Sequence, residues 1–89
     1  MSEIEQPILD AIAVLEPNAY GVTIFEYLES LGIKTNFGRL YVGLNRLEDE
    51  GYIRSDYRIL AKDRARRYVF LTGKRMPPEP NPDLVFNPA

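Results

Sequence analysis

The spacing of apolar residues changes once along this chain, from the period of a helix to the period of a strand. Up to about residue 50, apolar side chains recur three and four positions apart, whereas between Tyr52 and Thr72 they alternate with polar ones. A helix returns to the same face after about 3.6 residues and a strand after two. The order therefore predicts a helical part followed by a β-hairpin.

Three helical stripes are separated by residues that stop helices. The first helix is predicted to open with Pro7 and to end near Glu16, because Pro17 cannot continue it. The second ends at Gly32, and Thr23 with Glu26 has the spacing of a capping box, although the helix could start a residue or two earlier. The stripes of these two helices are Ile8, Ala11, Ile12 and Leu15, and then Ile24, Phe25, Leu28 and Leu31.

The third helix is predicted to run from an Asn36 cap to about Glu50, with Gly51 closing it. Its buried stripe consists of Leu40, Leu44 and Leu47, with Phe37 and Tyr41 at the margin.

Two segments rich in Tyr, Ile, Val and Phe follow, Tyr52 to Leu60 and Arg66 to Thr72, joined by the polar connection Ala61 to Ala65. They predict a β-hairpin, although its tip lacks the Gly that tight turns favour. Met76 to Ala89 holds five of the seven prolines and cannot be helical for long.

The predicted class is α+β, mainly α: a winged helix-turn-helix with three helices, a β-hairpin wing and a Pro-rich C-terminal tail. Residues 1–75 are predicted to form this DNA-binding domain, and residues 76–89 an extended or disordered tail.

The charges are distributed unevenly along the chain. All eleven Lys and Arg residues lie between Lys34 and Arg75, whereas residues 1–33 contain six acids and no base. The formal net charge of −2 therefore conceals a basic segment on an acidic support. Such asymmetry suggests a phosphate-facing surface, although basic residues also commonly cover ordinary solvated faces.

Composition excludes several kinds of chemistry. The chain has no Cys and no His, so thiol catalysis, disulfides and zinc sites with thiolate or imidazole ligands are excluded. We predict no catalytic residue, metal or cofactor, and therefore no enzyme. The apolar runs are too short for a membrane span, and a cytoplasmic protein is the default expectation.

The third helix should present a polar face opposite Leu40. An α-helix fits the major groove, where Arg pairs with guanine, Asn pairs with adenine and an apolar group contacts the thymine methyl. Gly38 would let the backbone approach DNA closely. The candidate DNA-binding residues on this helix, including its cap and Tyr41, are Asn36, Gly38, Arg39, Tyr41, Val42, Asn45 and Arg46.

Basic residues also gather at the hairpin tip, where a wing would reach phosphates or a neighbouring groove: Lys62, Arg64, Arg66 and Arg67. A charged tip is also a common way to block edge pairing between sheets. Tyr68 and Phe70 should point away from the core. They would form a second apolar surface for a partner or for Leu84, Val85 and Phe86 of the tail, or be shielded by neighbouring Arg stems.

The segments ILDAIAVLEPNAYG, GRLYVGLNRLEDEGYI and RARRYVFLTGK resemble the PadR-type winged-helix regulators over about residues 7–73. The resemblance is carried by Leu40-Tyr41, Leu44, Leu47-Glu48 and Gly51, and by Arg66-Arg67-Tyr68 and Leu71-Thr72 in the wing. It implies a bacterial or phage transcriptional regulator that binds operator DNA. It also implies a phosphate contact from Tyr41, although an aromatic residue at the core edge explains Tyr41 equally well.

The resemblance further implies a long dimerisation helix after Leu71-Thr72, but Pro77-Pro78 interrupts that region. We therefore expect a short form without this helix, and a homodimer stays open. A winged helix that binds a protein instead of DNA is the alternative function. The sequence does not indicate the operator, the direction of regulation or a small-molecule effector.

Overall fold

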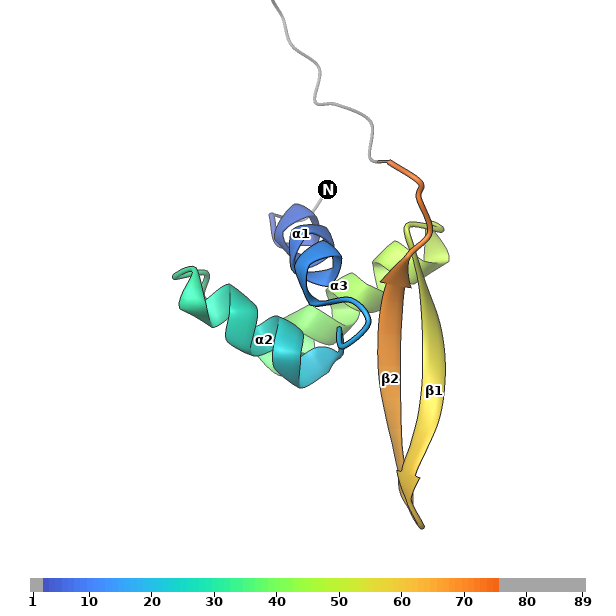
Figure 1. Ribbon diagram of the computed structural model, residues 1–89. Helices are drawn as coiled ribbons and strands as arrows, with labels where there is room; N and C mark the ends of the chain where they lie inside the picture. The colour runs from blue at the N-terminus through green and yellow to red at the C-terminus, as the bar shows by residue number, and fades with distance from the viewer. Residues whose placement is uncertain (1–2, 76–89) are drawn as a thin grey trace, which may run out of the picture.

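The computed structural model describes residues 3–75, and it confirms the predicted winged-helix architecture. Three helices pack together, and a two-stranded antiparallel hairpin stands beside them (Figure 1). The predicted tail, with Leu84, Val85 and Phe86, lies outside the described residues. The elements are α1 Glu5–Leu15, α2 Gly21–Ser30, α3 Phe37–Asp49, β1 Ile53–Ala61 and β2 Arg64–Leu71.

The beginnings of the first two helices differ from the prediction. α1 starts at Glu5, so Pro7 is its third residue; a proline in the first turn removes no helical hydrogen bond, because those N–H groups have no partner in the helix. α2 starts at Gly21, and the Thr23 hydroxyl accepts a hydrogen bond from the Tyr20 N–H at 3.0 Å. Thr23 thus lies in the first turn and is not the cap, so the predicted capping box with Glu26 is wrong.

The predicted stripes form most of the core, although Leu15 and Phe25 are only partly buried and Leu31 is exposed. Ile8, Ala11, Ile12, Ile24, Leu28, Leu40, Leu44 and Leu47 are all buried. The hairpin adds Ile53 and Val69 to this core, so the helices and the wing share one apolar interior. Leu31 was expected on the buried side but is 57% exposed, because α2 ends at Ser30 and Leu31 lies on its C-cap.

The hairpin is longer than its sequence suggested. Ala61 pairs with Arg64, so the turn consists of Lys62 and Asp63, and the predicted five-residue connection is wrong. The pairing shifts between Ile59 and Ala61. Such a bulge increases the local twist of the strands, and within residues 3–75 no residue other than Gly has a positive φ angle.

The base of the hairpin is fixed to the connection between α1 and α2. The Val69 N–H donates to the Ala19 carbonyl at 2.9 Å, and the Leu71 N–H donates to Glu16 Oε1 at 2.7 Å. These bonds give partners to the Val69 and Leu71 N–H groups, on the edge of β2 that does not pair with β1. The other end of the hairpin extends well beyond the helices (Figure 1).

Candidate nucleic-acid interface

α3 is buried along one face and exposed along the other. Leu40, Leu44 and Leu47 face the core, and Gly43 faces α1. A Cβ atom on Gly43 would lie 2.8 Å from Ile8 Cδ1, so only a glycine lets α1 approach this closely. The predicted polar face is confirmed as exposed: Gly38, Arg39, Val42, Asn45 and Arg46.

The N-terminal end of α3 is organised by Asn36. Its Oδ1 atom accepts a hydrogen bond from the Arg39 N–H at 2.8 Å, which confirms Asn36 as the helix cap. A Cβ on Gly38 would come within 3.3 Å of the same oxygen. The side chain of Arg39 has no hydrogen bond or ion pair within residues 3–75, so its guanidinium is free to bind a ligand.

Arg46 is anchored to α1. Its Nη1 atom lies 3.4 Å from Oε1 of Glu5, whose side chain is buried, whereas the Arg46 side chain is 56% exposed. A buried carboxylate needs such a partner. Arg46 therefore has a structural contact in addition to its place on the exposed face. Sequence reasoning missed Glu5, although an acid within an apolar first turn is a signal that could have indicated it.

Tyr41 lies at the edge of the core and remains 44% exposed. Its hydroxyl fits against Gly21 at the start of α2, where a Cβ would be only 2.6 Å from the oxygen. The Tyr41 ring continues a row of aromatic rings, with Phe37 at 6.3 Å and Phe25 stacked on Phe37 at 4.5 Å. The position is compatible with both predicted roles of Tyr41.

Five of the predicted residues line a single hollow beside the first turns of α3. This hollow has a volume of about 450 Å³, and its walls include Asn36, Gly38, Arg39, Val42 and Arg46. A second groove of about 420 Å³ lies between the start of α2, α3 and the wing. It brings together Tyr41, Arg64, Arg66 and Arg67. Asn45 and Lys62 line neither depression.

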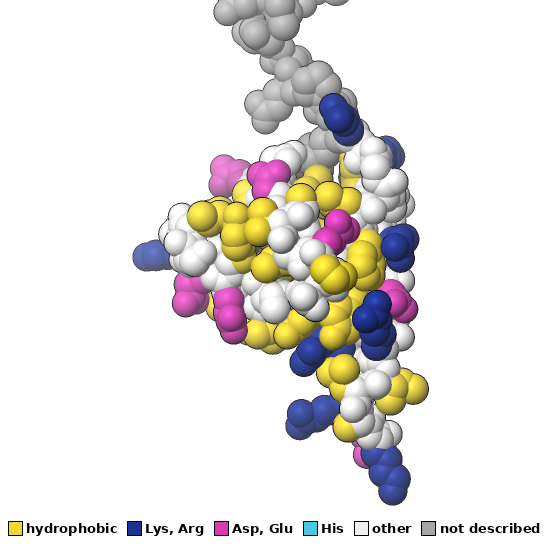
Figure 2. Space-filling model, viewed as in Figure 1, with side chains coloured by type: hydrophobic (Ala, Val, Ile, Leu, Met, Phe, Trp, Pro, Cys, Tyr) yellow, Lys and Arg dark blue, Asp and Glu magenta, His cyan; other side chains and the backbone are white. Residues whose placement is uncertain are grey.

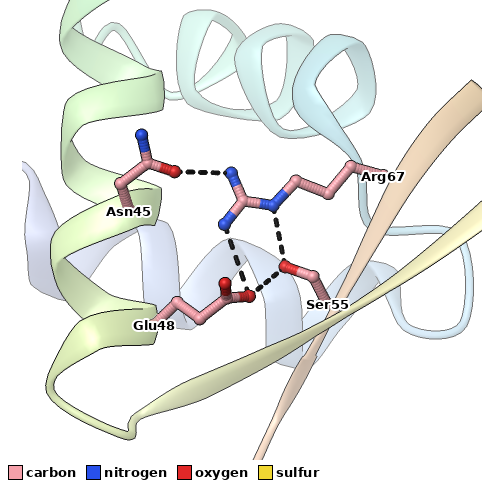
Figure 3. Close-up of polar contacts among 4 residues, drawn as sticks. All are labelled: Asn45, Glu48, Ser55 and Arg67. Carbon is pink, nitrogen blue, oxygen red and sulfur yellow. Dashed lines mark hydrogen bonds and ion pairs between the residues drawn. The ribbon is translucent and has the colours of Figure 1, made fainter.

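Arg67 joins the wing to α3 through a polar network (Figure 3). Its Nε atom donates to Ser55 Oγ at 2.7 Å and its Nη1 atom donates to Asn45 Oδ1 at 2.7 Å. Its Nη2 atom lies 3.4 Å from Oε1 of Glu48, and its side chain is only 15% exposed. Unlike Arg39, Arg67 therefore has all three guanidinium nitrogens occupied within the protein.

Glu48 and Ser55 complete this network. The Ser55 hydroxyl donates to Glu48, and this hydrogen bond, with the nearby charge of Arg67, lowers the pKa of the Glu48 carboxyl below its ordinary value of 4.5. The sequence analysis named Glu48 only as part of the family resemblance and did not name Ser55, so it did not predict this contact. The pairing of a strand serine with a helix glutamate depends on how the hairpin docks, which spacing along the chain does not reveal.

The outer face of the hairpin is covered by stacked arginines. Arg66 lies 4.0 Å from the centre of the Tyr20 ring, Arg58 lies 4.7 Å from that of Tyr68, and Arg54 lies 4.5 Å from that of Phe70. The hydrogen bond that Arg66 donates to the Tyr68 hydroxyl raises the pKa of the Arg66 guanidinium above its ordinary value. The Arg54 guanidinium covers the Phe70 ring among the described residues, and a contact of Phe70 with a partner or with the tail stays a prediction.

The hairpin tip carries the remaining predicted basic residues. Lys62 and Arg64 are exposed, and their side chains have no hydrogen bond or ion pair among the described residues. Apolar side chains accompany them: Ile59 is 83% exposed and Tyr57 is 64% exposed. The alternation of the strand puts Tyr57 and Ile59 on the same face as the buried Ile53. It does not reveal that the helices end before this part of the hairpin, which leaves both side chains exposed.

Charge is separated in space as well as in sequence. On the face shown in Figure 2, Lys and Arg side chains gather along the hairpin and its tip, while most acids lie over the helices. Within residues 3–75 no group of three or more acidic side chains is arranged to hold a metal ion. No helix in that range is long and apolar enough to cross a membrane.

Three packed helices, an exposed polar face on the third and a hairpin with a basic tip define a winged helix-turn-helix protein. Comparison with family models identifies the group within this class. Residues 8–74 match the Transcriptional regulator PadR-like family, and the chain belongs to this family. It is a family of transcriptional regulators, which agrees with the expectation that the chain is not an enzyme. No curated protein matches the chain.

Proposed function

We propose that the protein binds double-stranded operator DNA sequence-specifically, with α3 in the major groove and the hairpin as a basic wing on the backbone. One observation carries this proposal. The bond from Arg67 to Asn45 joins the wing directly to the exposed face of α3, so that both basic regions belong to one continuous surface. Such a surface suits double-stranded DNA, because the helix can enter the major groove while the basic hairpin beside it contacts the phosphates.

Base reading is assigned to the first two turns of α3. Arg39 and Val42 are exposed, and the guanidinium of Arg39 has no internal partner among the described residues. Arg donates two parallel hydrogen bonds to guanine, and Val contacts a thymine methyl group. At the N-terminal end of α3, the cap residue Asn36 and the small residue Gly38 would let the protein backbone approach DNA closely. Arg46 lies further along the same face, where its bond to Glu5 sets its position.

Phosphate binding is assigned to the wing and to its groove with α2. Lys62 and Arg64 supply free charges at the tip, and Arg66 and Tyr41 line the groove near the α2 N-terminus. Positive side chains neutralise phosphates without reading sequence, and this part of the affinity falls as salt rises. On the face shown in Figure 2, most acidic side chains lie over the helices and the basic ones gather along the hairpin.

The test is fluorescence anisotropy with labelled duplexes: the protein's own upstream region and a scrambled control, each over a salt series. Specific regulation requires tight binding to the upstream region that falls steeply with salt, together with weaker binding to the control. Arg39→Ala should cost about 1–3 kcal/mol on the preferred site and less on random duplex.

Arg75→Ala is the matched control, because Arg75 lies beside Gln6 and Asp10 of α1, away from the α3 face. It should leave the preference between the two duplexes unchanged. Equal losses from Arg39→Ala on both duplexes would reduce Arg39 to a phosphate contact. No binding at low salt would reject the proposal in favour of a protein partner.

A further inference from the structure

We infer that Arg67 fixes the orientation of the Asn45 amide, so that Asn45 presents its NH₂ group to DNA and favours guanine, which has two adjacent acceptors, over adenine. This inference rests on the proposed function, because it concerns how the α3 surface distinguishes bases. It also gives the wing a second role, because a wing residue then determines which hydrogen-bonding groups α3 presents to the bases.

The orientation follows from the chemistry of the guanidinium group. Arg can only donate hydrogen bonds, so the Asn45 atom that faces it must be the amide oxygen. Nη1 of Arg67 lies 2.7 Å from Asn45 Oδ1. The NH₂ group then points the other way, as Figure 3 shows, with the nitrogen of Asn45 directed away from the guanidinium.

Arg67 is itself held in place, so it cannot rotate freely with Asn45. Ser55 accepts from its Nε atom at 2.7 Å, and the Glu48 carboxylate lies 3.4 Å from its Nη2 atom. The Ser55 hydroxyl also donates to Glu48, so the two partners hold each other. Turning the amide over would place NH₂ hydrogens against the guanidinium hydrogens and lose the bond.

This orientation changes which base Asn45 can read. A free Asn pairs with adenine because its oxygen accepts from N6 and its nitrogen donates to N7. With its oxygen directed towards Arg67, Asn45 directs only its two N–H donors away from the wing. In the major groove guanine presents two acceptors, thymine presents one, and adenine presents one beside an N6 donor that would repel the amide hydrogens. Cytosine presents only a donor. Guanine is therefore expected at the base pair facing Asn45.

The experiment selects bound duplexes from a randomised pool and sequences them, using the full chain and Arg67→Met. The wild type should favour guanine over adenine at the Asn45 position by on the order of tenfold. Arg67→Met frees the amide, and the preference should shift towards adenine at that position. Arg64→Met is the control: it removes a charge from the same strand without touching Asn45, so affinity falls while the base preference stays.

A second variant and a second readout keep the inference testable if Arg67→Met folds poorly. Asn45→Asp retains an oxygen for Arg67 but replaces the outward NH₂ with an oxygen, so the guanine preference should disappear. In the free protein, ¹⁵N relaxation of the Asn45 side-chain amide should show a rigid group in the wild type and a mobile one in Arg67→Met.

The outcomes separate this inference from the proposed function. If the wild type enriches no sequence, the proposed DNA binding fails, while the relaxation data on the free protein still judge the amide orientation. If the wild type selects a sequence but prefers adenine at this position, the inference is wrong and DNA binding stands. The same conclusion follows if Arg67→Met keeps the wild-type preference, or if its Asn45 amide is as rigid as that of the wild type.

Discussion

The two ends of the hairpin differ in what their side chains contact. At the base, Ile53 is 2% exposed and Val69 is fully buried against the helices. Six residues further along the same strand, Ile59 is 83% exposed. Both isoleucines lie on the same strand face by alternation. Alternation therefore identifies the face of a strand, while the extent of the helices beneath it decides whether that face is core or surface.

The same difference separates the arginines. Towards the base and middle, Arg54, Arg58, Arg66 and Arg67 are each held by an aromatic ring, a carboxylate or a hydroxyl. At the tip, Arg64 has no such partner among the described residues. Contacts within the protein thus hold the basic side chains of the base and middle of the hairpin in fixed positions, whereas the guanidinium of Arg64 at the tip is unconstrained.

Truncation of the two isoleucines is the strongest test of this comparison. Ile53→Ala should lower the free energy of unfolding by about 2–5 kcal/mol, because it opens a cavity in the shared core. Ile59→Ala should change it by less than about 0.5 kcal/mol. Urea denaturation followed by circular dichroism measures both, and Ile53→Val, expected to cost about 0.5–1.5 kcal/mol, serves if the alanine variant is unfolded. Similar losses at the two positions would contradict the division of the hairpin.

Replacing an arginine with methionine should distinguish the two ends of the hairpin in the same way, with a smaller change in the free energy of unfolding. Arg67→Met removes the partner of Asn45 and one of the two partners of Ser55 and of Glu48, which still bond each other, and this should cost about 1–3 kcal/mol of stability. Arg64→Met should cost less than about 0.5 kcal/mol. On DNA, Arg64→Met should reduce the slope of log affinity against log salt by about one phosphate contact. An unchanged slope would remove the tip from the interface.

The fold was predictable from the sequence because its signals are local. The Asn36 cap, Gly51 with φ of 84° and the leucines of α3 each depend on residues within a few positions. The hairpin turn was less accessible, because a bulge replaced the glycine that a tight turn normally requires. The exposed set of α3 residues also followed from helical geometry alone.

The contacts within the site were not predictable in this way. Arg67 was expected among the phosphate-binding residues, and its DNA contact stays a prediction, but its guanidinium joins residues up to 22 positions away. Such partners are set by how the hairpin docks on α3. The pairing of Arg46 with Glu5 spans 41 positions for the same reason. The sequence predicts which basic residues are candidates for a binding surface, and only the packing distinguishes the free ones from those engaged within the protein.

Protonation of Glu48 should give the smallest effect, because it weakens only the contacts of Glu48 with Ser55 and Arg67 and leaves the hairpin tip unchanged. The pKa of Glu48 in the folded protein lies below its ordinary value of 4.5, so folding favours the ionised carboxylate. This stabilisation is present above about pH 4.5 and is lost as the pH falls through the folded pKa. Because the side chain is 38% exposed, solvent screens the effect, and it should stay below about 1 kcal/mol.

Stability measured by urea denaturation between pH 7 and pH 3 should therefore fall less steeply for Glu48→Gln than for the wild type. Asp49→Asn is the matched control, since Asp49 is the next residue of α3 and its side chain has no hydrogen bond or ion pair within residues 3–75. It should leave the acid-dependent loss attributable to Glu48 unchanged. If the Glu48→Gln profile instead followed the wild type throughout, the carboxylate would contribute nothing to docking, and Ser55 and Asn45 would be the partners that hold Arg67 to α3.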